Sequence, residues 1–326
     1  MISKAEGLNR NRIINKVKIT GKAKREKKRM DRRRREKIYK IILLSCAALA
    51  LLLILLIGGF VFWQGLPVLL KYGAVSMLAG LKWSPGSQLY GLWPMIVGSV
   101  YITLGALIIG VPLGVMTAIF LAEMAPRGFA AKVIRPTIEL LAGIPSVVYG
   151  LFGMTTVVFL VRKLESSIPR YANDPLLSTG YGVIPGAVVL AIMILPTIIN
   201  VSEDAIRAVA PDYKEASLAL GATHWQTISR IIVPAASSGI GAAVVLGMGR
   251  AVGETMAVIM VAGNSPIVPG SIFSPLRSLT GNIALEMAYS SGEHTQALFF
   301  TGIVLFVMIM LINTLAIRIM KRGKKA

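Results

Sequence analysis

IILLSCAALALLLILLIGGFVFW, residues 41–63, is the stretch that decides the fold class of this chain. Its 23 residues carry no charge, and a helix needs about 20 consecutive apolar residues to cross the hydrocarbon core of a bilayer. The run is too long for the apolar part of a secretory signal, and a polar segment of 40 residues precedes it. We therefore interpret it as a first transmembrane helix.

Five further apolar runs of similar quality follow the first. They occupy residues 92–121, 140–161, 183–201, 235–262 and 297–317. The run 92–121 exceeds one straight crossing, so we expect a tilt or a kink near Pro112. Hydrophobic residues make up 55% of the chain and charged residues only 15%, whereas roughly a quarter of a soluble domain is charged. The sequence thus predicts an all-α integral membrane protein with six transmembrane helices.

Basic residues are distributed unevenly along the chain. Residues 1–40 hold 17 Lys and Arg against four Asp and Glu, and a second basic tail occupies 318–326. With the N-terminus in the cytoplasm, the segments inside the cell hold 28 basic residues and those outside hold six. Cytoplasmic loops are enriched in Lys and Arg, so we expect a multi-pass protein of the cytoplasmic membrane with both termini inside.

The N-terminal tail, with four consecutive arginines at 32–35, has two interpretations. It can lie on anionic membrane lipid, where each basic side chain is worth about 1 kcal/mol near the surface. Alternatively, it is a docking arm for a regulator. We favour the lipid interpretation. A nucleic-acid partner is not expected, because the tail lacks the aromatic residues or motif that such binding uses.

The sequence offers nothing to build a metal or redox site. Cys46 is the only cysteine, and the two histidines, His224 and His294, are far apart in the chain. An internal disulfide, a C-x-x-C site and a zinc site are excluded on this basis. We expect no cofactor and no metal. A membrane-embedded enzyme would need a cluster such as His with Asp at membrane depth, which the spans lack.

The most informative polar loop is 202–234. Pro211 suits the first position of a helix and Gly221 suits the residue after a helix end. Tyr213, Ala216 and Leu220 then share one stripe of that helix. The stretch Thr223-His224-Trp225-Gln226 is a capping box for a second helix, which continues to Pro234 at the start of the fifth span. Such a short helix can pack on its own membrane domain, lie on lipid, or insert in a groove of a partner.

The fifth span contains two charges, Arg250 and Glu254. An arginine at the bilayer centre costs about 2.5–3.5 kcal/mol, so a partner must compensate for it. The two residues are four apart and can pair on one helix face. Alternatively, Arg250 contacts an anion, for which its guanidinium fork is suited, while Glu254 positions it or competes with that anion. Pro145 in the third span is a candidate helix kink or gate.

The loop also contains a motif with fixed spacing. Glu215-Ala216-Ser217, three residues, Gly221, nine residues, and Ile231-x-Val233-Pro234 resemble the EAA loop of ABC-importer permeases. Ser217 and Val233 depart mildly from that pattern. The resemblance implies a permease subunit of a type I importer, whose coupling helix docks on a separate ATPase. It assigns coupling to Tyr213, Glu215, Ala216, Leu220 and Gly221. The chain has no phosphate-loop motif of its own, so it is not expected to be an enzyme.

Two more stretches resemble one family of such permeases. Residues 250–264, Arg-Ala-Val-Gly-Glu-Thr-Met-Ala-Val-x-Met-Val-Ala-Gly-Asn, and residues 139–150, Glu-Leu-Leu-Ala-Gly-Ile-Pro-Ser-Val-Val-Tyr-Gly, are similar to the permease of the high-affinity phosphate (Pst) importer. Thr255-Met256-Ala257 and Gly263-Asn264 are similar to the PstC type. The resemblance covers roughly 90–320 and places the importer's transmembrane domain at 92–317.

The resemblance implies a bacterial or archaeal cell membrane and a path for inorganic phosphate that uses Arg250 and Glu254. The implied partners are a paralogous permease (PstA type), two ATPase subunits (PstB type) and an extracytoplasmic phosphate-binding protein (PstS type). Two alternatives stay open. The chain can be a permease for another oxyanion, or a membrane sensor or scaffold that reports phosphate status.

Overall fold

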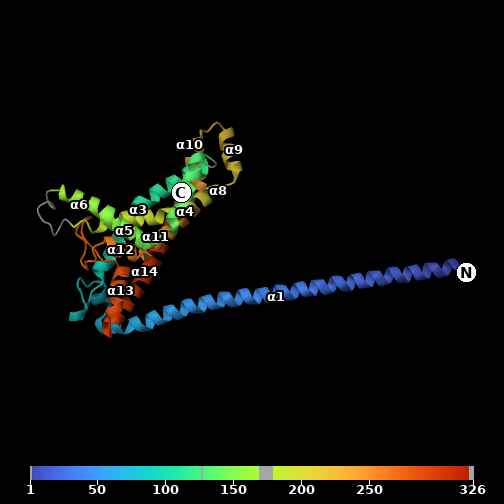
Figure 1. The fold of residues 1–326 in the computed structure, drawn as a ribbon, viewed down its shortest axis with the longest axis horizontal. Coiled ribbons are helices and arrows are strands. Elements are labelled where there is room, and N and C mark those ends of the chain that lie inside the picture. Colours follow the sequence, from blue (N-terminus) through green and yellow to red (C-terminus); the bar gives the residue numbers. More distant parts are fainter. Residues whose placement is uncertain (1, 126–127, 169–178, 323–326) are drawn as a thin grey trace. The chain divides into compact units, whose positions relative to one another are not determined.

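The computed structural model describes residues 2–125, 128–168 and 179–322, without the side chains of 2–35, 130, 131 and 319–322. The predicted roles of the arginines at 32–35 therefore lie outside the described side chains. The chain divides into two compact units, 1–60 and 61–326. The first unit is the helical segment that contains most of the first span. The second unit holds all the other elements (Figure 1).

The residues that the structure describes are mostly helical, and they include one short hairpin. The helices are α1 (Ile2–Tyr72), α2 (Ala74–Leu78), α3 (Trp93–Ile119), α4 (Phe129–Gly143), α5 (Ser146–Phe152), α6 (Val158–Ser166), α8 (Val183–Arg207), α9 (Pro211–Ala219), α10 (His224–Thr227), α11 (Val233–Gly253), α12 (Met256–Val261), α13 (Leu279–Glu286) and α14 (Glu293–Arg322). The hairpin pairs β1 (Trp83–Ser84) with β2 (Leu89–Tyr90) in antiparallel fashion. Three π-helical turns, Phe120–Met124, Gly153–Val157 and Ile228–Ile232, continue α3, α5 and α10.

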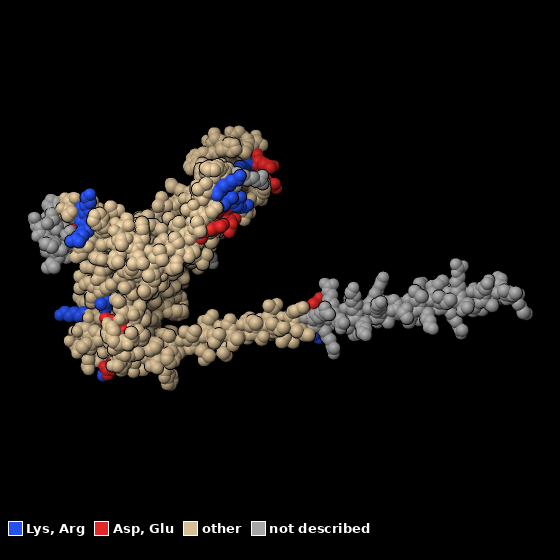
Figure 2. Space-filling model, in the orientation of Figure 1, with Lys and Arg blue, Asp and Glu red and all other residues tan. Residues whose placement is uncertain are grey.

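Six helical segments are long and apolar enough to cross a bilayer, as the sequence predicts. Within the described residues they are Glu36–Tyr72, Trp93–Met124, Ser146–Ser166, Val183–Arg207, His224–Gly253 and Glu293–Arg318. Large apolar side chains are exposed along their outer faces, an arrangement that is stable where lipid is the solvent. Figure 2 shows charged side chains gathered toward the ends of the second unit, with a broad uncharged surface between them.

Helix α8 is the centre of the second unit. It packs along α3 on one side and along α11 on the other, and it is the most buried of the six spans. Small residues allow the close approach. A Cβ at Gly114 of α3 would lie 2.7 Å from Ile198 of α8, and one at Gly247 of α11 would lie 2.9 Å from the same side chain. Glycine lets membrane helices approach closely and gain van der Waals contact.

The third predicted span, 140–161, differs from the structure. Helix α4 ends at Gly143, and α5 begins at Ser146 with Pro145 in extended conformation before it. Pro145 thus lies at a break between two helices and not at a kink within one. A proline has no N–H to continue the α4 ladder and favours an extended residue before it. The apolar span itself begins at Ser146 and runs to Ser166.

The fifth predicted span, 235–262, also has different bounds. A continuous helical run begins at His224, after the expected capping box, and ends at Gly253. Glu254 is extended, with φ −68° and ψ 134°, and a separate helix, α12, follows from Met256. The helix end falls between the two charges that the sequence placed on one helix face.

Candidate functional site

Arg250 lies in the last turn of α11, and its side chain is exposed on the surface of this chain. Ser238, Ala242 and Leu246, each four residues apart, are exposed on the same face of the helix. Within the part of the chain that the structure describes, Arg250 has no hydrogen bond and no ion pair. Its guanidinium therefore keeps its donors free on an otherwise uncharged stripe.

Glu254 does not pair with Arg250, contrary to one of the two expectations. Its Oε1 accepts a hydrogen bond from the backbone N–H of Ala257 at 3.2 Å, so the carboxylate caps the start of α12. Its carbonyl, which the helix break leaves without an intrahelical donor, accepts from the Thr280 hydroxyl at 3.0 Å. The break separates the two charged side chains because Glu254 turns towards α12 and α13.

The two stretches 139–150 and 250–264, distant in sequence, meet in the fold. Helix α5 packs against α12, and a Cβ at Gly150 would lie 2.5 Å from Sδ of Met260 and 3.2 Å from Cα of Ala257. Tyr149 donates its hydroxyl to the carbonyl of Leu141 at 2.7 Å, which bridges the break around Pro145. Both helix breaks therefore lie beside one another.

The predicted helix of the polar loop is α9, and its stripe faces outward. Tyr213 is 60% exposed and Leu220 is 89% exposed, while Ala216 and Glu215 are exposed as well. Gly221 follows the helix at φ +86°, a left-handed conformation that favours glycine.

The second helix of the loop begins with the expected capping box. Thr223 Oγ1 accepts from the Gln226 N–H, and the Gln226 side chain accepts from the Thr223 N–H. This local geometry was predictable because every partner lies within a few residues. The loop therefore contains a helix, a glycine turn and a second helix that leads into α11.

The inward face of α9 carries two contacts that the sequence did not indicate. Lys214 Nζ lies 2.5 Å from Glu123 Oε2, in the π-helical turn at the end of α3. The hydroxyls of Ser217 and Thr227 lie 2.9 Å apart and are buried. Sequence offered one weak signal, since Ser217 departs from the Ala of the motif.

A buried ion network at the α13 end of the second unit was also missed. The Glu286 carboxylate accepts from Arg277 Nη1 at 2.5 Å and from Trp83 Nε1 at 2.8 Å, and His294 Nε2 lies 2.8 Å away. Arg277 donates further to the Asn264 carbonyl at 2.9 Å. These side chains join the hairpin, the loop after α12, α13 and α14. No periodicity could reveal the network, because its members are far apart in sequence.

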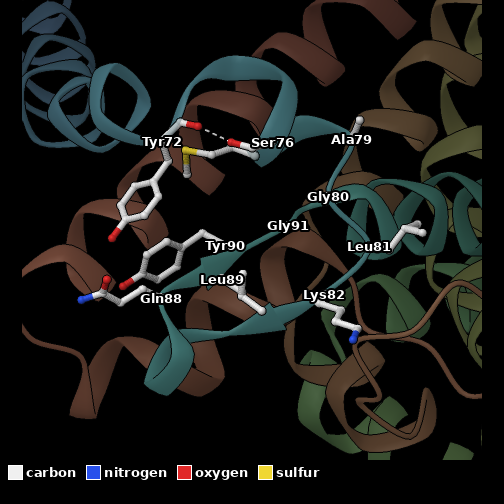
Figure 3. A pocket seen from close by; sticks show the side chains of 11 residues that line it. Tyr72, Ser76, Ala79, Gly80, Leu81, Lys82, Gln88, Leu89, Tyr90 and Gly91 are labelled. Carbon is white, nitrogen blue, oxygen red and sulfur yellow. Dashed lines mark hydrogen bonds between the residues drawn. The ribbon is translucent and has the colours of Figure 1, made fainter.

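A cavity of about 450 Å³ lies between α2 and the hairpin, beside this network. Tyr72 and Tyr90 line it with their rings 5.3 Å apart (Figure 3). Burial raises the pKa of the Tyr90 hydroxyl above its ordinary value, so the phenol stays neutral. None of the predicted site residues lines this cavity. Among the described residues, no group of three His, Cys, Asp or Glu side chains could hold a metal ion.

Comparison with known proteins identifies relatives of this chain. Residues 110–324 match the family described as binding-protein-dependent transport system inner membrane component. The probable ABC transporter permease protein YqgH of Bacillus subtilis is 41% identical over 251 residues, which cover 75% of this chain and 78% of that protein. The phosphate transport system permease protein PstC of Haemophilus influenzae is 38% identical, over 76% of this chain and 82% of that protein. The phosphate transport system permease protein PstC of Mesorhizobium japonicum is 36% identical, over 78% of this chain and 79% of that protein.

Solved structures agree on the fold. A bacterial alginate ABC transporter in complex with an alginate-bound periplasmic protein has a TM-score of 0.57 at 18% identity, over 89% of this chain and 98% of that chain. A second structure of an alginate importer gives 0.54 at 17% identity, over 88% of this chain and 98% of that one. The expected fold, an all-α ABC-importer permease domain, is thereby confirmed. The chain belongs to the family of binding-protein-dependent transport system inner membrane components.

Proposed function

We propose that this chain is a permease subunit of an ATP-driven importer and forms part of the path for inorganic phosphate across the cytoplasmic membrane. The relatives named as phosphate permeases support this substrate. Membership of a family of transport components accords with a subunit that transports and does not catalyse. The observation that carries the proposal is Arg250, an exposed cation on a membrane-spanning helix without an acidic partner among the described residues.

Arg250 is positioned to bind an oxyanion. A buried or lipid-facing arginine without compensation is costly, and the Glu254 carboxylate is occupied at the start of α12. The guanidinium fork can donate two parallel hydrogen bonds to phosphate oxygens. The exposed stripe of Ser238, Ala242, Leu246 and Arg250 would face a paralogous permease, and the phosphate path would run between the two subunits. Glu254 then acts indirectly, because it fixes the break that ends α11.

The outward stripe of α9 supports docking on an ATPase subunit. Tyr213, Ala216 and Leu220 are exposed, which disfavours the interpretation that this face packs on the chain's own membrane domain. A groove of a partner would bury these side chains and Glu215 beside them. Two ATPase subunits (PstB type) would drive the complex. The α9 end is then cytoplasmic, as are both termini, and the α13 end faces an extracytoplasmic phosphate-binding protein (PstS type).

The paired helix breaks are suited to gating. The packing of α5 on α12 brings the breaks at Pro145 and Glu254 together, and Arg250 lies in the last helical turn before the second break. Discontinuous membrane helices can change their relative angle at a break without disrupting the helices on either side. A change at Pro145 would therefore alter access to Arg250.

The test is phosphate uptake by proteoliposomes that contain the complete importer with Arg250→Ala. Hydrogen bonds to charged groups contribute about 1.5–3 kcal/mol, so uptake should fall at least about tenfold while the subunits still assemble. Arg230→Ala is a matched control, because Arg230 is exposed on the same helical run at its other end. Normal phosphate uptake by the Arg250 variant would exclude the pathway role. Sulfate uptake in place of phosphate would instead identify another oxyanion.

A further inference from the structure

Helix α9 has two faces with different chemistry. Tyr213 and Leu220 point outward, whereas Lys214 and Ser217, three residues apart, point towards the membrane helices. Residues three apart lie on one side of a helix. The same short helix therefore presents one face to a docking partner and another to its own chain.

Lys214 connects α9 to the end of α3. Its ammonium lies 2.5 Å from the carboxylate of Glu123, which is only 11% exposed. The two residues are 91 positions apart, so the contact is purely tertiary. A carboxylate this buried depends on its partner, because an unpaired charge in such surroundings is costly. Displacement of α9 therefore acts on Glu123.

The turn that carries Glu123 is itself held firmly. The Leu121 carbonyl accepts from Arg207 Nη2 at 2.9 Å and from Arg135 Nη2 at 3.3 Å. Both arginines also bind Glu203 Oε1, at 2.9 and 2.8 Å. These contacts tie the end of α3 to α4 and α8. A force on Glu123 is thus delivered to the α3–α8 pair at the centre of the second unit.

Ser217 fixes the rotation of α9. Its buried hydroxyl lies 2.9 Å from that of Thr227, on the second helix of the loop. With this bond in place, Lys214 faces Glu123 and the stripe of Tyr213 and Leu220 faces outward. Thr227 lies in the first turn of the helical run that begins at His224, and Arg250 lies further along that run, about 35 Å away at 1.5 Å per residue. Helix α9 is therefore joined to the two spans α3 and α11.

From these contacts we propose that Lys214 is a positioning residue that transmits the movement of the coupling helix to α3 through Glu123. The inference rests on the proposed function, in which α9 docks on an ATPase subunit. Lys214 does not contact the transported anion or the nucleotide. Its role is to convert a displacement of α9 into a displacement of α3 and α8. Without the ion pair, α9 can follow the ATPase while α3 remains where it is.

The experiment measures anion uptake per ATP hydrolysed by the complete importer, reconstituted with its binding protein. In Lys214→Met, ATPase subunits should stay bound and ATP hydrolysis should continue, while uptake per ATP falls about fivefold or more, the range typical of coupling between sites. Glu123→Gln should give the same loss. The exchange Lys214→Glu with Glu123→Lys should restore most of the ratio. Lys132→Met, an exposed lysine on α4, is the matched control.

A lysine that merely stabilises the fold would lower uptake and ATP hydrolysis together, and an unchanged ratio in Lys214→Met would overturn the proposal. If the variant with both exchanged residues folds but does not restore the ratio of uptake to ATP hydrolysis, the proposal is overturned as well. Failure of the proposed function gives a different result. Loss of the substrate assignment appears as transport of another anion by the unmodified importer, for which the ratio is still measurable. Loss of the docking assignment appears as ATPase subunits that stay bound in Leu220→Asp.

Discussion

Replacement of Glu286 by glutamine tests the buried network at the α13 end. The Glu286 carboxylate is 8% exposed and accepts hydrogen bonds from Arg277 and Trp83. The His294 Nε2 atom lies 2.8 Å from Oε2 of the same carboxylate. A glutamine offers one acceptor oxygen and one NH₂ donor. One end of the new side chain must therefore face a donor. Arg277, 15% exposed, would keep only neutral acceptors.

The magnitude follows from this geometry. Breaking a buried ion pair from one side costs about 3–5 kcal/mol, because it leaves an uncompensated charge. Since Arg277 keeps hydrogen bonds to two neutral oxygens, we expect a value at the lower end, about 3 kcal/mol in the free energy of unfolding. The hairpin, the loop after α12, α13 and α14 should lose their packing first, because Glu286 joins these four segments.

The measurement is unfolding of the purified protein in mixed micelles, followed by tryptophan fluorescence to which buried Trp83 contributes. Glu293→Gln is the matched control. Glu293 also binds a cation and an aromatic hydroxyl, Lys71 and Tyr72, but Lys71 is 55% exposed and water screens the pair. The control should lose far less stability. Equal losses in the two variants, or a loss below about 1 kcal/mol for Glu286→Gln, would refute the reasoning.

Two further predictions concern glycines of the site. Gly221→Val places a branched side chain at φ +86° with no atom within 4 Å of the new Cβ, so it strains the turn after α9 by about 1–2 kcal/mol without a clash. ATP hydrolysis should no longer respond to the binding protein, although the chain still enters the membrane. A normal response in the purified complex would contradict this. Gly150→Leu pushes against Met260 and Ala257, so it should separate α5 from α12 and abolish phosphate uptake. Gly143→Leu, with nothing within 4 Å of its Cβ, should retain uptake. Equal effects of the two variants would show that the α5–α12 contact is unimportant for uptake.

Sequence alone predicted the six spans and the plan of the polar loop. Residues 41–63 can be recognised as a span from their own length and apolar composition, because the requirement of the bilayer applies to each segment whatever its neighbours are. The capping box at Thr223 and the glycine turn at Gly221 were equally accessible, since their partners lie within a few positions. Charge within an apolar span drew attention to Arg250 and Glu254, and helical spacing predicted the stripe of Tyr213, Ala216 and Leu220 on α9.

Only the tertiary structure decided where two of those spans break and which charges meet. The helix can end at Gly253 because the Glu254 carbonyl finds the Thr280 hydroxyl, 26 residues away. The break at Pro145 is bridged by Tyr149 in the same manner. Lys214 and Glu123 are 91 residues apart, and no local sequence pattern predicts that they pair. A polar group freed within a membrane must be satisfied by whichever donor the fold brings to it, and a local pattern does not contain that information.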